Sequence, residues 1–204
     1  MNKKYSMILG AAIMSVFAIV IAYAALSATL TITTNKITQN ALTWNVGFTT
    51  GTVNATAVGT SATGRTCGSA TVAATSITVA DTTLSKPGDG CIWKFTVKNT
   101  GGIAAKLSSI VPAEPSSTSC TKTNASSSAG AQMVCGNLTY SINSAASNSS
   151  GTTITKTGLT TGSTLAASTG SLDVYLVVQY TGTGLNGSAV TQSGGKFTFT
   201  YEQA

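Results

Sequence analysis

The sequence predicts an all-β protein that folds as a single jelly-roll-like β-sandwich. Thr (37 residues) and Ser (25 residues) dominate a chain of 204 residues of which only 8% are charged, and this composition favours strands over helices. Apolar and polar residues alternate with a period of two along several segments, which is typical of strands with one buried face. Turn-forming residues separate these segments at the short spacing of a sandwich.

The chain contains no histidine and only five acidic residues. Without histidine there is no Ser-His-Asp triad, no Cys-His dyad, no His-Glu-x-x-His motif and no zinc site that uses histidine. Five carboxylates leave little material for acid–base catalysis. We therefore expect a protein that is not an enzyme and that holds no metal and no cofactor.

The first 24 residues have the pattern of a secretory signal peptide. A short basic stretch precedes a nearly unbroken apolar run at 7–26, and Ala22 and Ala24 supply the small side chains that a signal peptidase reads. We expect cleavage after Ala24, with Ala28 as the second choice, and a mature protein that is secreted, extracellular or on the cell surface. The alternative is a retained membrane anchor, because the run approaches the ~20 residues that span a bilayer.

The basic residues do not form a binding surface for nucleic acid. The formal net charge is +6, but Lys3 and Lys4 belong to the leader and the other basic residues are scattered singly. We expect no nucleic-acid partner, and contact with a membrane only during export.

The rest of the chain divides into an N-terminal strand segment at 25–40 and a sandwich domain at 41–204. Strong turn signals lie at 86–90 and 99–102, and polar loops are expected at 145–151 and 181–187, with a long Ser-rich insertion at 112–130. The clearest alternation lies at 26–33, 42–48, 91–98, 138–142, 172–180 and 197–201, and weaker strands are expected at 53–58, 69–79, 104–110 and 152–155.

Four cysteines follow the leader, which in an exported chain predicts disulfides. Of the three pairings, we favour Cys67–Cys91 with Cys120–Cys135, because each closes a short local loop. A site that binds a metal through four cysteines usually contains Cys-x-x-Cys pairs, and neither pair has that spacing.

Three other residue classes have the chemistry for binding roles. The aromatic residues fall on alternating apolar faces, which favours a core position over a carbohydrate site. The aspartates lack the Asp-x-Asp-x-Asp pattern of a calcium loop, and Asp89 fits a turn residue better. Of five Asn-x-Ser/Thr triplets, those in expected loops are the candidate glycosylation sites. The aromatic residues are Trp44, Trp93, Phe95, Tyr140, Phe197 and Phe199, and the aspartates are Asp81, Asp89 and Asp173. The candidate glycosylation sites are Asn124, Asn148 and Asn186, and the remaining triplets begin at Asn54 and Asn137.

One stretch resembles a known family. Lys86-Pro87-Gly88-Asp89-Gly90 leads into an alternating strand that ends in Lys98-Asn99-Thr100-Gly101, and Ala104-Ala105-Lys106-Leu107 begins the next strand. This arrangement resembles the TasA/camelysin family of secreted fibre proteins of the biofilm matrix, and the related archaeal bundling pilins. Two further features are similar to that family. They are the signal peptide that runs directly into a Thr-rich strand and the late strand at 172–180. The four cysteines and the Ser-rich insertion depart from the simplest members.

The resemblance implies a structural subunit of an extracellular fibre, pilus or biofilm matrix that polymerises head-to-tail by donor-strand exchange. Its partners would be copies of itself, with accessory fibre or anchoring proteins. The N-terminal alternation fits a donor, because every second side chain must enter the acceptor's core. The same alternation also fits an ordinary edge strand of its own domain. We expect donor residues Ala28, Leu30, Ile32 and Ile37, and an acceptor groove at Leu172, Val174, Leu176, Val178, Phe197 and Phe199.

The alternative function is that of a monomeric cell-surface adhesin or carbohydrate-binding β-sandwich. Such a protein would show an exposed aromatic cluster, and its assembly state would not depend on the N-terminal strand.

Overall fold

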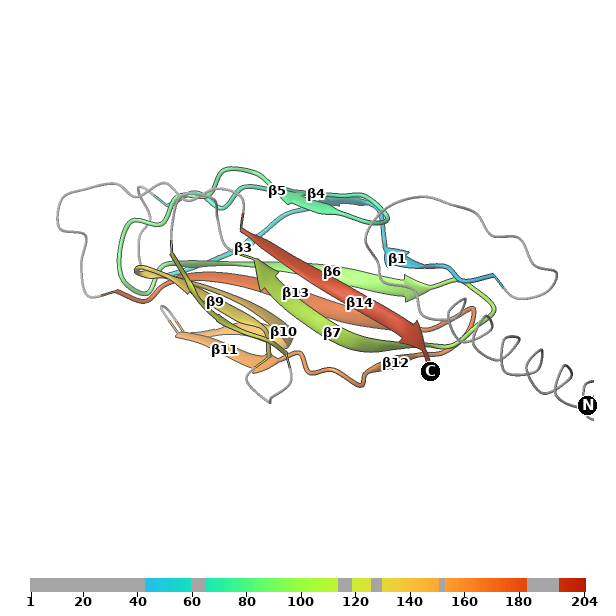
Figure 1. The fold of residues 1–204 in the computed structure, drawn as a ribbon. Coiled ribbons are helices and arrows are strands. Elements are labelled where there is room, and N and C mark those ends of the chain that lie inside the picture. Colours follow the sequence, from blue (N-terminus) through green and yellow to red (C-terminus); the bar gives the residue numbers. More distant parts are fainter. Residues whose placement is uncertain (1–42, 60–64, 114–118, 126–129, 151–152, 183–194) are drawn as a thin grey trace, which may run out of the picture.

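A computed structural model describes residues 43–59, 65–113, 119–125, 130–150, 153–182 and 195–204 (Figure 1). This part of the chain is all-β, as the sequence predicts, and none of it forms a helix, so it contains no helix able to cross a membrane. The strands are β1 (Val46–Phe48), β2 (Gly51–Val53), β3 (Thr56–Val58), β4 (Ala70–Val72), β5 (Ile77–Val79), β6 (Gly90–Asn99), β7 (Ala105–Ala113), β8 (Thr121–Thr123), β9 (Gln132–Cys135), β10 (Leu138–Ser150), β11 (Thr153–Gly158), β12 (Thr164–Leu165), β13 (Ser171–Tyr180) and β14 (Lys196–Gln203).

The strands form one large and two small antiparallel sheets. The large sheet has the order β1-β6-β13-β10-β9-β8, with β3 also paired to β6 and β11 to β10. The small sheets have the orders β12-β7-β14 and β2-β4-β5. The pairings β6–β13 and β7–β14 are the longest, and both join segments far apart in the sequence.

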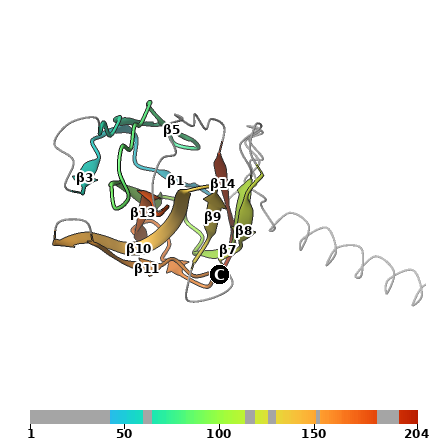
Figure 2. The same ribbon diagram turned by 90° about the vertical axis from the view of Figure 1, so that its left-hand side faces the viewer.

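Both small sheets cover the same face of the large sheet (Figure 2). Leu107, Ile110 and Tyr201 of the sheet β12-β7-β14 pack with Val97 and Val174 of the large sheet in one buried cluster. A second cluster joins the sheet β2-β4-β5 to the face of β6, around the fully buried Trp93. The period-two alternation of β6 and β13 therefore places their apolar side chains between two layers.

The structure corrects the expected loop at 145–151. Residues up to Ser150 continue β10, and their partners in β11 run from Thr153 to Gly158. Ser, Asn and Ala have weak strand propensity, but cross-strand pairing overrides it here. The Ser-rich insertion at 112–130 also contains strand, since β7 continues to Ala113 and β8 lies within it.

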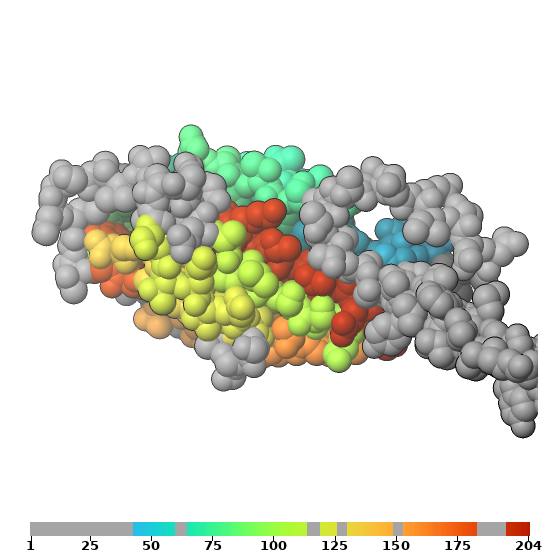
Figure 3. Space-filling model, in the orientation of Figure 1, coloured from blue at the N-terminus to red at the C-terminus, as the bar shows by residue number. Residues whose placement is uncertain are grey.

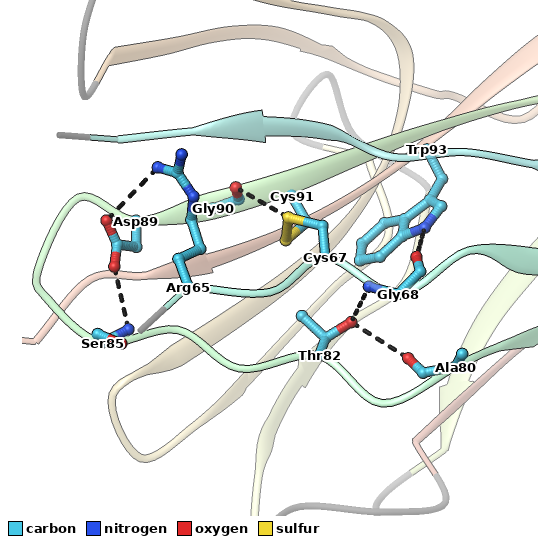
Figure 4. The surroundings of a disulfide bond; sticks show 10 residues. All are labelled: Arg65, Cys67, Gly68, Ala80, Thr82, Ser85, Asp89, Gly90, Cys91 and Trp93. Carbon is cyan, nitrogen blue, oxygen red and sulfur yellow. Dashed lines mark hydrogen bonds and ion pairs between the residues drawn. A yellow bond between two sulfur atoms is a disulfide. The ribbon is translucent and has the colours of Figure 1, made fainter. Parts of the chain in front are cut away.

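Both expected disulfides are present: Cys67–Cys91, with a Cα–Cα distance of 5.8 Å, and Cys120–Cys135, at 4.4 Å. The first links the segment before β4 to β6, beside the Trp93 indole, whose N–H donates to the carbonyl of Gly68 at 2.8 Å (Figure 4). The two disulfides indicate an oxidising compartment, as outside the cell.

The two turn motifs at the ends of β6 have structural roles. The carboxylate of Asp89 is buried and accepts hydrogen bonds from the backbone N–H groups of Ser85 and Lys86, each at 3.0 Å, which confirms it as a turn residue. Gly88 adopts a φ of 89°, a conformation that favours glycine. At the other end, the buried side chain of Asn99 donates to the carbonyl of Ile103 at 2.7 Å and closes that turn.

Candidate functional site

The strand β14 has one edge that no described strand pairs with. It binds β7 on one side and ends the order β12-β7-β14. In Figures 1 and 2, β14 lies between β7 and the sheet β2-β4-β5, so its open edge faces that sheet. We call the line between β14 and the sheet β2-β4-β5 the seam. Figure 3 shows the red β14 reaching the surface beside the teal segment that contains β4 and β5.

Proline fixes which backbone groups of β14 face the seam. Phe197 pairs with Pro112, which has no N–H and so cannot belong to a hydrogen-bonded pair. The N–H and C=O of Phe197 therefore point away from β7, and so do those of Phe199 two residues on. The open edge thus presents two sets of backbone donors and acceptors to an additional strand.

The floor of the seam consists of apolar side chains that are only partly buried. Phe48 and Leu176 pack against both buried clusters, so they lie where the two small sheets meet. The ring of Phe199 contacts that of Phe48 edge-to-face, with centroids 5.9 Å apart. Phe197 and Leu172 are also partly buried against the first cluster. An apolar strand lying along the seam would remove this surface from water.

Two polar atoms in the same region are buried without a hydrogen-bond partner among the described residues. They are the indole N–H of Trp44, which packs against the first cluster, and the hydroxyl of Tyr201, which is 2% exposed within that cluster. Burial raises the pKa of Tyr201, so its hydroxyl stays protonated as a donor. Buried donors without partners are uncommon in native structures.

The six expected acceptor residues lie on two strands with different surroundings. Leu172, Val174, Leu176 and Val178 face the core from β13, which is paired on both sides by β6 and β10. Phe197 and Phe199 lie on β14, beside its open edge. The expected donor residues Ala28, Leu30, Ile32 and Ile37, and the whole segment 1–42, lie outside the described residues. The sequence did not single out Phe48 as part of this region.

The remaining aromatic residues belong to the core or its margin. Trp93 and Phe95 are buried, whereas Trp44 and Tyr140 are partly buried. Burial raises the pKa of Tyr140.

The three aspartates considered for calcium do not come together. Asp81 is exposed, Asp89 faces Arg65 at 3.8 Å inside its turn, and Asp173 pairs with Lys94. Within the described ranges no three Cys, Asp or Glu side chains form a group that could hold a metal ion.

A second polar feature lies on the outer face of the large sheet. Lys94 donates to Asp173 at 2.8 Å, and its Nζ lies 5.8 Å from the ring centre of Tyr175. The hydrogen bond between Lys94 and Asp173 raises the pKa of the lysine and lowers that of the aspartate. This pair lies beside an open hollow that the sequence analysis did not anticipate.

Ser141 and Lys156 lie close enough to suggest a nucleophile and its base, but the site is closed. The Lys156 amine donates to the Ser141 hydroxyl at 3.3 Å, and burial lowers the pKa of that amine. The Asn143 amide donates to the same hydroxyl at 3.0 Å, and Ser141 and Asn143 are each 1% exposed. No substrate reaches this hydroxyl, so the network stabilises β10 against β11.

The Asn-x-Ser/Thr triplets fall in different places. Asn124 is exposed after β8, Asn148 is exposed within β10 rather than in a loop, and Asn186 lies outside the described residues. Asn54 is exposed between β2 and β3, and Asn137 is exposed in the turn between β9 and β10.

The chain matches no protein-family model, no curated protein and no solved structure.

Proposed function

We propose that the protein is a non-catalytic structural subunit of an extracellular fibre, with a jelly-roll-like sandwich that polymerises head-to-tail by donor-strand exchange. Support for export comes from the leader pattern of the sequence and from the two disulfides. The low charge of the chain reduces repulsion between packed subunits. The resemblance to the TasA/camelysin family points to the same role.

The observation that carries the proposal is the open edge of β14. Its backbone groups at Phe197 and Phe199, which no described strand pairs with, lie next to partly buried rings, so one strand can satisfy both at once. Open edges of this kind are normally blunted by charge, proline or short length. β14 is eight residues long, and its residues 197–201 are Phe, Thr, Phe, Thr and Tyr. It therefore suits strand addition, in which the backbone supplies affinity and alternate side chains fill pockets.

The partner strand is the N-terminal segment of the next subunit. In the sequence, Ala28, Leu30 and Ile32 alternate with Thr residues, so one face of a strand there is apolar and the other is hydroxylated. Those apolar side chains would lie over Phe48, Phe199 and Leu176. Because the donor and acceptor surfaces differ, each addition leaves a free donor and a free acceptor, and the assembly grows as an open filament.

The test exchanges side chains on the two faces of the donor. In one variant Leu30→Asp and Ile32→Asp place charges on the face that enters the acceptor. In the matched control, Thr31→Asp and Thr33→Asp place the same charges on the other face. Filaments are followed by negative-stain electron microscopy and sedimentation of the secreted chain at rising concentration. We expect the first variant to remain unassembled and the control to form filaments.

A complementation arm separates loss of assembly from loss of folding. A synthetic peptide of residues 25–37 should bind the unassembled variant at the seam and raise its melting temperature, because it fills the same acceptor. Filaments that form equally well from both variants would show that this strand is not the donor. A chain that stays monomeric and folded with its wild-type N-terminus, even with the cell's accessory proteins present, would favour the adhesin function instead.

A further inference from the structure

The outer face of the large sheet, opposite the core, carries a hollow with a preformed floor. β10 pairs with β13 only as far as Asn143 and Tyr175, and then continues with β11, with bulges on either side of the segment 145–148. Val58, Ile92 and Val177 form a small buried cluster on this face. The floor is therefore held in place by packing and needs no rearrangement to receive a ligand.

The lining combines an aromatic ring, amides and hydroxyls. Asn54 and Asn148 are both exposed; the first lies between β2 and β3 and the second within β10. The ring of Tyr175 is partly buried, and the Lys94 Nζ lies over it, 5.8 Å from the ring centre. The apolar residues Ile92 and Ala146 belong to the same small cluster as this ring. The volume is about 390 Å³, near the lower end of ligand pockets, and Thr56 and Ser147 complete the lining.

The charge of this hollow selects against ionic ligands. Among the described residues that line it, Lys94 is the one cationic side chain, and Asp173 neutralises it at 2.8 Å. Asp173 also accepts a hydrogen bond from Thr96 at 3.0 Å, so the carboxylate is held on the protein side. A single carboxylate already engaged in this way does not make a divalent cation site.

We propose that this hollow binds a neutral saccharide. A pyranose has an apolar C–H face and a rim of hydroxyls that both donate and accept hydrogen bonds. The Tyr175 ring and the side chain of Ala146, both partly exposed, match the C–H face, above the buried Ile92. The carboxamides of Asn54 and Asn148 each offer a donor and an acceptor, which matches a pair of neighbouring hydroxyls. This assignment is independent of strand exchange, because the hollow lies on the face away from the seam.

The saccharide can come from two sources. It can belong to a separate glycan, or it can be attached to the chain, since Asn54 and Asn148 each begin an Asn-x-Ser/Thr triplet. Both sources supply the same chemistry to the Tyr175 ring.

The experiment measures saturation transfer by NMR from the protein to maltotriose, cellotriose and N-acetylchitotriose, added separately at millimolar concentration. The chain is produced with its leader in a bacterial host that attaches no N-glycans. The method works for monomers and filaments alike. We expect transfer to the ring protons of at least one of these trisaccharides, and an affinity that falls about tenfold in Tyr175→Ala, equivalent to 1.4 kcal/mol.

Two matched variants make the result specific. Tyr175→Phe retains the ring and should keep most of the affinity, whereas Asn124→Ala removes an exposed amide away from the hollow and should change nothing. Transfer that is absent with all three sugars, or that is equal in wild type and Tyr175→Ala, would overturn the proposal. Peptide masses at Asn54 and Asn148 of the chain from its own cell then identify the source, because attached hexoses would mark a glycan carried by the chain itself.

Discussion

Phe48 and Phe199 meet edge-to-face across the two layers of the protein, with ring centroids 5.9 Å apart. Phe48 ends β1 at the edge of the large sheet, and Phe199 lies in the middle of β14 in a small sheet. This contact joins the layers at the seam, where further apolar surface is only partly buried.

Replacing Phe199 tests how much the contact between Phe48 and Phe199 contributes to stability. We expect Phe199→Ala to lower the free energy of unfolding by about 2 kcal/mol, less than for a fully buried ring because Phe199 is only partly covered. Thr198→Ala, the neighbouring position on the opposite face, should change it by less than about 0.5 kcal/mol. Urea unfolding followed by tryptophan fluorescence measures both. Equal effects at the two positions would contradict the orientation of β14.

Asp89 should be the most important acidic residue for stability. Asp89→Ala removes the acceptor for two backbone N–H groups and leaves Arg65 facing a buried site without its carboxylate. We expect a loss of about 2–3 kcal/mol. The matched control is Asp81→Ala, at an exposed position, for which we expect little change. Thermal unfolding of both variants is the measurement, and a similar melting temperature for the two would refute the role given to Asp89.

Each disulfide should contribute about 3 kcal/mol by restricting the unfolded chain, because the loops span 24 and 15 residues. The test uses two double variants, one with Cys67→Ala and Cys91→Ala and the other with Cys120→Ala and Cys135→Ala. Urea unfolding measures the stability of each. The stability of a variant with all four cysteines replaced should not change when a reductant is added. Mass spectrometry of an unreduced digest checks the pairing directly, and free thiols at these positions in the native protein would be incompatible with it.

The carboxyl of Asp173 should titrate below its ordinary pKa of 3.8, because Lys94 donates a hydrogen bond to its charged form. The stability that this pair contributes is therefore present above the unfolded-state pKa and is lost as the pH falls through the folded-state value. Carboxyl-carbon NMR across the acid range measures the pKa. We expect it to rise in Lys94→Met and to stay unchanged in Lys196→Met, which removes an exposed lysine from β14.

The strands with strict alternation were predictable from the sequence. β6, β13 and β14 lie within a residue or two of the expected ranges, because their Trp, Phe, Val and Leu residues fit a half-buried pleat. β8 was missed because Thr121–Thr123 has no alternation, and its place next to β9 is fixed by pairing and by the Cys120–Cys135 bridge.

The surroundings of the candidate sites were less predictable, because they depend on which strands become neighbours. Nothing in residues 196–203 says that this strand lies at an edge. One signal for the hollow was available, since Ile92 and Val177 occupy the polar positions of their alternation and are buried. Apolar residues on both faces of a strand indicate that both faces are covered.

The Cys67–Cys91 bridge also has a mechanical consequence. When tension is applied to the two ends of the chain, the residues inside this covalent loop carry none of it. At about 3.4 Å per residue, the bridge removes about 80 Å from the length to which the unfolded chain can stretch, and Cys120–Cys135 removes about 50 Å more. The loop closed by Cys67–Cys91 contains β4 and β5 of the sheet β2-β4-β5, whereas β2 lies before it. When the protein is pulled until it unfolds, both covalent loops therefore stay unextended, and reduction of the disulfides would lengthen the chain.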